Sequence, residues 1–335
     1  MEKKENQSNQ QENNSIPSLE LNIEMLQKNT KPKKKEYRNL GELISRVTKQ
    51  EMEELIQKQN TAGREIELAE IPEEYLAKAK KLLSEETTST ITERWANKYK
   101  EESSKFWDKF YKSNKDHAFK DRNYFYQALF EELLEKERFK DQERVALLDI
   151  GCGTGSTMFP LLRRTKKLDF YGIDLSPKAL QLLKENPEFD SERVKNVFVH
   201  DITKSDIPDL PEKSFDIVTL IFTLSAIHPD HYVPVFRRLK KMLKPNGVIV
   251  FRDYAVYDLS QLRFNQKENK LSENLYVRWT GTLSYFFSTE VIAKIASETE
   301  FKLLKNQYTS RQILNRKKCL VMHRIWIEAL FENTN

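Results

Sequence analysis

The pattern of apolar and polar positions divides the chain into a helical first part and a second part in which strands alternate with helices. Apolar residues before residue 140 recur at helical spacing, which predicts helices over residues 40–58, 72–83, about 91–111 and 124–138. Beyond it, short apolar runs typical of buried parallel strands cover residues 145–150, 168–173, 197–199, 215–222 and 248–251. This alternation predicts an α/β fold with a helical N-terminal extension.

Residues 255–281 interrupt the alternation and are interpreted as an insertion over the functional site. The pattern after them predicts a strand over 283–287, a helix over 290–297, and strands over 301–308 and 320–329. We therefore divide the chain into a tail (1–36), a helical region (37–140) and an α/β domain (141–335).

The amino-acid composition is informative mainly for the N-terminal tail. Residues 1–36 are rich in Asn, Gln, Lys and Glu, which predicts disorder. The tail closes on the basic cluster Lys31–Lys35, which would suit RNA binding or a nuclear signal, although such runs are usually only solvated. The chain has 56 Lys and Arg against 51 Asp and Glu, so its net charge of +5 does not impose polyanion binding.

Two cysteines, five histidines and no Cys-x-x-Cys pair argue against a structural zinc site or a disulfide scaffold. No stretch reaches the roughly 18 consecutive apolar residues of a membrane span, and the first residues carry no signal peptide. We expect neither a metal nor a membrane partner, and a location in the cytoplasm, with the nucleus as an alternative.

The most informative stretch is the glycine turn that follows the first strand, Gly151-Cys-Gly-Thr-Gly155. A dinucleotide fingerprint needs a third glycine where Ser156 stands, and no Gly-Lys-Ser/Thr follows, which excludes a phosphate-binding P-loop. Asp174 ends the second strand, 21 residues after Gly153. In nucleoside-binding folds an acid at this position accepts hydrogen bonds from the ribose hydroxyls. Asp201 ends the third strand and could accept from an adenine amino group. S-adenosylmethionine, which has a ribose but no phosphate, fits this set.

Other polar groups also follow strand ends. Thr223–Asp230 comes after the fourth strand, and its His228 and Asp230 could form a catalytic pair, although no nucleophile motif accompanies them. Arg252-Asp253 comes directly after the fifth strand, as either a structural ion pair or a catalytic one. Trp107 and Tyr111 share one helix face, which by itself indicates a core contact.

Together these motifs resemble the tRNA N3-methylcytidine methyltransferase family, over residues 107–331. The segments that carry the resemblance are Trp107-Asp-Lys-Phe-Tyr-Lys112, Phe119-Lys-Asp-Arg122, Gly151–Gly155, Phe159-Pro-Leu-Leu162, Leu220-Ile-Phe-x-Leu-Ser-Ala-Ile-His-Pro-Asp230, Phe251-Arg-Asp-Tyr254, Tyr257-Asp258, Gln261-Leu-Arg-Phe264 and Asn315-Arg-Lys-Lys318.

The resemblance implies a class I, Rossmann-like methyltransferase sheet of seven strands, an RNA-binding N-terminal region and S-adenosylmethionine as methyl donor. The acceptor would be a cytidine, the first anticodon-loop nucleotide of tRNA (position 32). The Trp107 and Tyr111 rings would then close over the cofactor instead of serving the core. The implied cofactor-binding residues, with the second glycine of the turn, are Trp107, Tyr111, Gly151, Gly153, Asp174, Asp201, Ile202 and Ile221.

Cytosine N3 carries a free lone pair at neutral pH, so no base has to remove a proton before methyl transfer, and positioning would supply most of the catalysis. The product is a cation that a carboxylate can stabilise. Our candidates are Asp253 first and Asp230 second, with Arg252 beside them. Expected RNA contacts, mainly to phosphate, are Lys120, Arg122, Arg278, Arg316 and Lys317.

The chain departs from the family in the insertion, where Arg278-Trp-Thr-Gly-Thr-Leu283 replaces the usual Arg-x-Asp-Gly-Thr-Arg. The Ala-Trp-Asp-x-Val-x-Trp segment of the threonine-tRNA branch is missing from the sequence, which favours tRNA-Ser as substrate. Expected partners are therefore tRNA and a seryl-tRNA synthetase or another auxiliary protein. The alternatives are a methyltransferase acting on another RNA, a protein or a small molecule, and a non-catalytic partner subunit.

Overall fold

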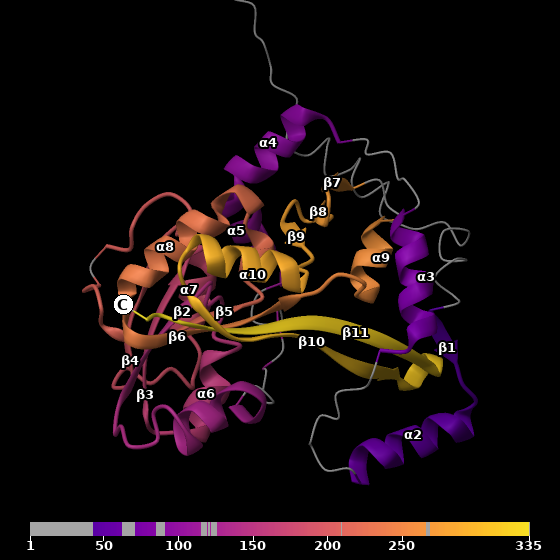
Figure 1. Ribbon diagram of the computed structural model, residues 1–335, viewed down its shortest axis with the longest axis horizontal. Coiled ribbons are helices and arrows are strands. Elements are labelled where there is room, and N and C mark those ends of the chain that lie inside the picture. Colours follow the sequence, from indigo (N-terminus) through magenta and orange to yellow (C-terminus); the bar gives the residue numbers. More distant parts are fainter. Residues whose placement is uncertain are drawn as a thin grey trace, which may run out of the picture.

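The computed structural model describes residues 43–61, 71–84, 91–114, 119, 121, 126–208, 210–265 and 269–334, so the predicted tail lies outside the described residues. Its centre is an eight-stranded sheet of order β1-β11-β6-β5-β2-β3-β4, with β10 paired to β11 (Figure 1). The predicted α/β fold is confirmed.

Five parallel strands form the part of the sheet that the sequence pattern predicted: β2 (Val145–Ile150), β3 (Leu168–Asp174), β4 (Val194–Val199), β5 (Phe215–Ile221) and β6 (Leu243–Tyr254). Two long antiparallel strands complete it, β10 (Lys302–Asn315) and β11 (Leu320–Glu332). β6 begins earlier than expected because the predicted turn is an irregularity inside it, where Asn246 has a φ of 62°.

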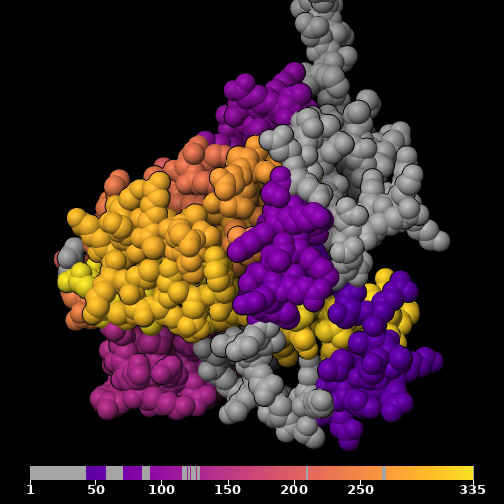
Figure 2. Space-filling view, turned by 45° about the vertical axis from the view of Figure 1, so that its right-hand side comes forward, coloured from indigo at the N-terminus to yellow at the C-terminus, as the bar shows by residue number. Residues whose placement is uncertain are grey.

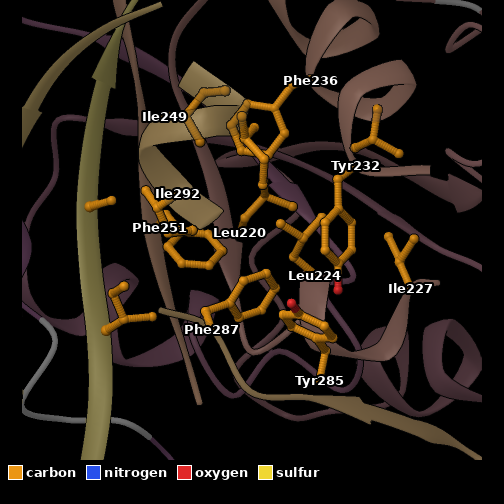
Figure 3. Close-up of a cluster of buried hydrophobic side chains, with 14 of the residues drawn as sticks. Leu220, Leu224, Ile227, Tyr232, Phe236, Ile249, Phe251, Tyr285, Phe287 and Ile292 are labelled. Carbon is orange, nitrogen blue, oxygen red and sulfur yellow. The ribbon is translucent and has the colours of Figure 1, made fainter. Parts of the chain in front are cut away.

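Hydrophobic clusters cover both faces of the sheet. One cluster contains α6 (Met158–Arg164) and α7 (Pro177–Lys184), and the other contains α8 (Tyr232–Met242) and α10 (Thr289–Glu298). In the second cluster Phe236 and Phe251 pack with Tyr232 and Phe287 (Figure 3). Both faces are buried, which agrees with the nearly continuous apolar runs of the parallel strands.

The sheet holds one strand more than the seven that the resemblance implied. β1 (Ile44–Arg46) pairs with Leu320–Met322 of β11, so the predicted helix over residues 40–58 is wrong in its first part. The physical reason is tertiary: β11 runs past the end of β6 and leaves unpaired backbone groups there, which a short strand satisfies. The helix itself is α2 (Lys49–Thr61).

The remaining N-terminal elements are largely as predicted. α3 (Glu73–Ser84) matches its prediction, whereas the long helix expected from residue 91 is divided at Glu102 into α4 (Glu93–Glu101) and α5 (Ser103–Asn114). The helix expected over 124–138 is present as two π-helical turns, η3 (Tyr126–Phe130) and η4 (Glu132–Lys136). α3 packs against β11, where the ring centroids of Tyr75 and His323 are 5.3 Å apart. The space-filling view shows α2, in indigo, beside the yellow C-terminal part of the chain (Figure 2).

The segment predicted to be an insertion contributes two strands to a sheet separate from the main one. It contains α9 (Leu259–Asn265), β7 (Lys270–Ser272) and β8 (Leu275–Val277), and the two strands join β9 (Leu283–Tyr285) in a separate three-stranded sheet. The buried carboxylate of Asp258 ties its start to β11, since it accepts hydrogen bonds from Arg324 Nε and the Ile325 N–H, both at 2.8 Å. α3 packs on it as well, where Tyr75 donates to the Tyr257 carbonyl at 2.9 Å.

Candidate cofactor and substrate site

The glycine turn after β2 needs glycine at each of its three positions, since the φ values of Gly151, Gly153 and Gly155 are 70°, 55° and 85°. A Cβ at Gly151 would lie 2.6 Å from the Thr223 Cγ2 atom, and one at Gly153 would lie 2.7 Å from the Tyr111 hydroxyl oxygen. The turn is therefore a tight cradle in which backbone N–H groups and carbonyls are brought close to a ligand.

Above the turn lies a cavity with about 740 Å³ of empty space, its open mouth included. This size is in the range of small-molecule sites. All eight residues that the sequence assigned to the cofactor line this cavity: Trp107, Tyr111, Gly151, Gly153, Asp174, Asp201, Ile202 and Ile221. The structure thus brings together residues spread over more than a third of the chain.

Asp174 sits at the carboxyl end of β3 with its side chain buried under the turn. One carboxylate oxygen accepts from the Gly153 N–H at 2.9 Å, and the other accepts from the Ser176 N–H at 2.8 Å. Burial raises the pKa of Asp174 to about 6, and these backbone hydrogen bonds only partly oppose the shift. Ser176 caps α7, because its hydroxyl accepts from the Ala179 N–H at 3.2 Å. Ser176, and not Asp174, is therefore the N-cap of α7, and Asp174 lines the cavity.

This pKa predicts that the affinity for S-adenosylmethionine falls as the pH drops below about 6. Ribose hydroxyls donate to the ionised carboxylate, and protonation removes the charge that strengthens those hydrogen bonds. Calorimetric titrations between about pH 5 and 8 measure the effect, expected to approach tenfold per pH unit well below the pKa. An Asp174→Asn variant should bind weakly with a flat profile. A wild-type affinity that does not change across this range would contradict the assignment.

Asp201 lies at the rim of the cavity, in the turn after β4. Its carboxylate accepts from the Thr203 N–H at 3.0 Å and from the Thr203 hydroxyl at 2.6 Å, and Lys204 lies 3.3 Å away. Burial alone would raise the pKa of Asp201, but the Thr203 hydrogen bonds and Lys204 lower it overall. The group is therefore an ionised acceptor, which suits the expected contact with an amino group.

One wall of the cavity is the aromatic face of α5. Trp107 and Tyr111 have ring centroids 6.0 Å apart, and both line the cavity. Asp108, between them, fixes the helix to the start of α7, since its carboxylate accepts from the Ser176 hydroxyl at 3.1 Å and the Lys178 N–H at 3.2 Å. The two rings thus lie beside the glycine turn. The family resemblance implied this position, whereas helical periodicity alone indicated a core contact.

The opposite wall follows β5 and contains residues that the sequence reasoning did not assign. Phe222 and Thr223 line the cavity, as do two residues at and just after η5 (Leu224–Ala226), namely Ala226 and Ile227. Thr223 ties this corner to the first strand by donating to the Ile150 carbonyl at 2.8 Å. The sequence held a signal for this wall, because Thr223 comes just after β5, at the same edge of the sheet where Asp174 ends β3.

Asp253, the first candidate for contact with a base, does not line the cavity. Its side chain is fully buried at 0% exposure. One oxygen accepts from the Ser225 N–H at 2.9 Å and the other from the Tyr254 N–H at 2.8 Å. Burial raises its pKa to about 6 against these hydrogen bonds. In this structure Asp253 therefore lies behind η5 and holds the segment that forms the cavity wall.

Asp230, the second candidate, lies on the surface at η6 (Pro229–His231), with its side chain 61% exposed. It forms an ion pair with Lys100 of α4, and the pair lowers the pKa of Asp230. Its oxygen also lies 3.2 Å from His228 Nδ1. Asp230 is not among the residues that line the cavity, and its ion pair with Lys100 links α4 to the α/β domain.

Arg252 forms the structural ion pair that was one of its two sequence-based alternatives. It is 5% exposed and bound to Glu328, its cross-strand neighbour on β11, while its guanidinium carbon lies 4.9 Å from the Trp326 ring centroid. Lys305 adds a second cation 2.9 Å from Glu328. The Arg252 guanidinium therefore joins β6 to β11, and Arg252 does not line the cavity.

The expected RNA contacts are divided. Lys120 and Arg122 lie outside the described residues. Arg316 and Lys317 are exposed in η7 (Arg316–Lys318), at the tip of the β10–β11 hairpin. β11 begins at Leu320, close to η7, and pairs with β6 only from Trp326, six residues later. The tip therefore stands roughly 20 Å beyond the carboxyl end of β6. That end is the cavity side of the sheet.

The described residues contain no group of three or more His, Cys, Asp or Glu side chains that could hold a metal ion. In the same part of the chain, every helix is too short or too polar to cross a membrane. S-adenosylmethionine fits the residues that are present: a buried carboxylate for the ribose, a glycine cradle that a Cβ would fill, and aromatic rings to close over the ligand.

Comparison with known proteins supports the same assignment. The sequence profile of a family described as "Methyltransferase domain" matches residues 148–249. The human tRNA N(3)-cytidine methyltransferase METTL6 is 42% identical over 235 residues, which cover 70% of this chain and 81% of the human protein.

Two fungal proteins are also similar. The tRNA N(3)-methylcytidine methyltransferase trm140 of Schizosaccharomyces pombe is 37% identical over 263 residues, 78% of this chain and 83% of the relative. The tRNA(Thr) (cytosine(32)-N(3))-methyltransferase of Saccharomyces cerevisiae is 38% identical over 265 residues, 78% of this chain but only 42% of the yeast protein.

Proposed function

The chain belongs to the tRNA N(3)-cytidine methyltransferase family, and from this premise we propose that it methylates cytidine 32 of tRNA-Ser. The coarser activity follows from the family: the protein is an S-adenosylmethionine-dependent methyltransferase that forms N3-methylcytidine in tRNA. The observation that carries the proposal is the single cavity in which the glycine turn, Asp174, Asp201 and the α5 rings converge.

When bound, S-adenosylmethionine supplies an electrophilic sulfonium methyl group. Asp174 would hold the ribose, Asp201 the adenine, and Trp107 and Tyr111 would cover the ligand and exclude water. Cytosine N3 has its own lone pair, so the protein needs no general base, and its task is to hold the base in line. The η5 segment, supported by Asp253, forms the wall against which the base would lie.

The finer points rest on separate observations. Position 32 is supported by the name of the Saccharomyces cerevisiae relative, a tRNA(Thr) (cytosine(32)-N(3))-methyltransferase. An unpaired loop nucleotide can also present its Watson–Crick edge at low cost. The preference for tRNA-Ser is supported by the missing threonine-branch segment. We include a seryl-tRNA synthetase as auxiliary partner in the proposal. The exposed cations Arg316 and Lys317 suit phosphate contacts with the RNA.

The test is methylation of defined RNA. Purified protein is incubated with labelled S-adenosylmethionine and tRNA-Ser or tRNA-Thr transcripts, with and without seryl-tRNA synthetase, and the digested nucleosides are separated. We expect 3-methylcytidine in tRNA-Ser and its loss when cytidine 32 is replaced by uridine. Product in tRNA-Thr alone would overturn the preference, and product that survives the replacement would overturn the position. No 3-methylcytidine under any condition would refute the activity.

A further inference from the structure

The turn between β8 and β9 presents an exposed tryptophan. Trp279 is 57% exposed, and among the described residues only Val199 and Leu304 are other large hydrophobic side chains of comparable exposure. An indole ring has a large apolar surface and is usually mostly buried. Its exposure is therefore unusual, although a single exposed apolar side chain does not by itself indicate a binding site.

The backbone that carries Trp279 is held in one shape. The Arg278 N–H donates to the Thr282 carbonyl, and the Gly281 N–H donates to the Arg278 carbonyl, both at 2.8 Å. Gly281 has a φ of 83°, and a Cβ there would lie 2.2 Å from the Phe106 ring on α5. The turn thus rests directly on α5, and the indole is presented at little cost in backbone entropy on binding.

The turn also contacts residues that adjoin the two walls of the cavity. On one side Phe106 is the neighbour of Trp107, which lines the cavity. On the other side the Arg278 guanidinium carbon lies 5.4 Å from the Tyr254 ring centroid, and Tyr254 is 5.0 Å from the ring of Phe222, which also lines the cavity. The turn that carries Trp279 therefore lies next to residues that adjoin both walls of the cavity, in the part of the molecule where α5 and β9 come close together (Figure 1).

Arg278 adds a cation to the turn, and its charge acts on the buried Asp253 carboxylate, where it partly opposes the rise in the pKa of Asp253. Its Nη2 atom donates to the Ser284 hydroxyl at 3.3 Å, while its Nε atom is buried without a hydrogen-bond partner in the described part of the chain. Those described residues place no carboxylate within ion-pair distance of it. An aromatic ring beside an arginine is the combination that proteins use to hold unpaired nucleotides, by stacking and by contact with phosphate or carbonyl oxygens.

We propose that Trp279 stacks on an anticodon-loop base next to the target cytidine, while Arg278 contacts the same unpaired stretch of RNA. The inference rests on the proposed function and adds a binding position to it. Base stacking tolerates any base, so Trp279 contributes affinity and orientation without selecting the sequence. It stands in the segment where the family's acid and base are replaced by Thr280 and Leu283, and Leu283 is buried at 2% exposure.

The test compares Trp279→Ala, Trp279→Phe and the matched control Leu304→Ala, which removes an exposed apolar side chain from β10. Binding of a tRNA anticodon stem-loop is measured directly, alongside kcat and KM for methylation. We expect Trp279→Ala to raise the Kd and KM for RNA about tenfold, with cofactor affinity and melting temperature unchanged. Trp279→Phe should stay within about threefold, because it keeps a ring to stack, and Leu304→Ala should match the wild type.

Salt dependence separates stacking from charge. Trp279→Ala should leave the slope of log Kd against log salt unchanged, whereas Arg278→Ala should lower it by about one. Wild-type RNA affinity in Trp279→Ala, with 3-methylcytidine still formed, would overturn the inference and leave the proposed function standing. RNA binding that depends on Trp279, without formation of 3-methylcytidine, would support the inference and refute the proposed function. A Trp279→Ala variant that keeps RNA affinity and loses only a synthetase complex would assign the ring to a protein partner instead.

Discussion

Replacing Asp174 by alanine is expected to weaken S-adenosylmethionine binding by about 30-fold or more. Two losses add up. The ribose loses a charged hydrogen-bond acceptor. The Gly153 N–H loses the Asp174 carboxylate oxygen that accepts from it at 2.9 Å and so fixes the glycine turn. A buried N–H without an acceptor costs about 1–3 kcal/mol, so the variant should also melt earlier. Calorimetry gives the affinity and thermal denaturation gives the stability.

Asp169→Ala is the matched control for this result. Asp169 stands on the same strand and binds Arg144, an ion pair remote from the cavity lining. Because such partly exposed pairs contribute little, we expect cofactor affinity within about twofold of the wild type. Equal affinity of Asp174→Ala and wild type would refute the ribose assignment, whatever the melting temperatures.

Replacing Asp253 by alanine should abolish most of the turnover and leave cofactor binding nearly intact. The N–H groups of Ser225 and Tyr254 would lose their acceptors in a fully buried place, at a cost of about 2–4 kcal/mol in the free energy of unfolding. The η5 segment would then relax, and Ala226 and Ile227 would leave their positions in the cavity wall. Misplacement of a reacting base by about 1 Å can lower kcat about 100-fold.

Stability alone could mimic this loss, so the control is Asp216→Ala. Asp216 is a buried acid that accepts from the Ala146 N–H at 2.9 Å, but it lies at the amino end of β5, away from the cavity. Both variants should be destabilised, and only Asp253→Ala should lose kcat when they are assayed well below their melting temperatures. A similar kcat in the two variants would show that Asp253 has no positioning role. A large loss of cofactor affinity in Asp253→Ala would also contradict it.

Strand-end acids were predictable because their position is encoded locally. Asp174 and Asp201 each end a short apolar run, and carboxyl ends of neighbouring parallel strands meet at one edge of a sheet. The glycine turn is readable for the same reason, since only glycine adopts its φ values readily. The α5 rings were different: helical periodicity indicated a core face, and only the family motif indicated a ligand.

What the sequence by itself determined is therefore the α/β alternation, the glycine cradle and the acids around it, because periodicity and strand-end position act over a few neighbouring residues. The tertiary structure decided what depends on distant pairing. The register of β11 against β6 places Glu328 opposite Arg252 and makes that pair structural. Asp253 is buried where it accepts from the Ser225 N–H of η5, and the packing of Gly281 on Phe106 fixes the turn that carries the exposed Trp279 against α5. No local pattern encodes such contacts, since each joins residues far apart in the chain.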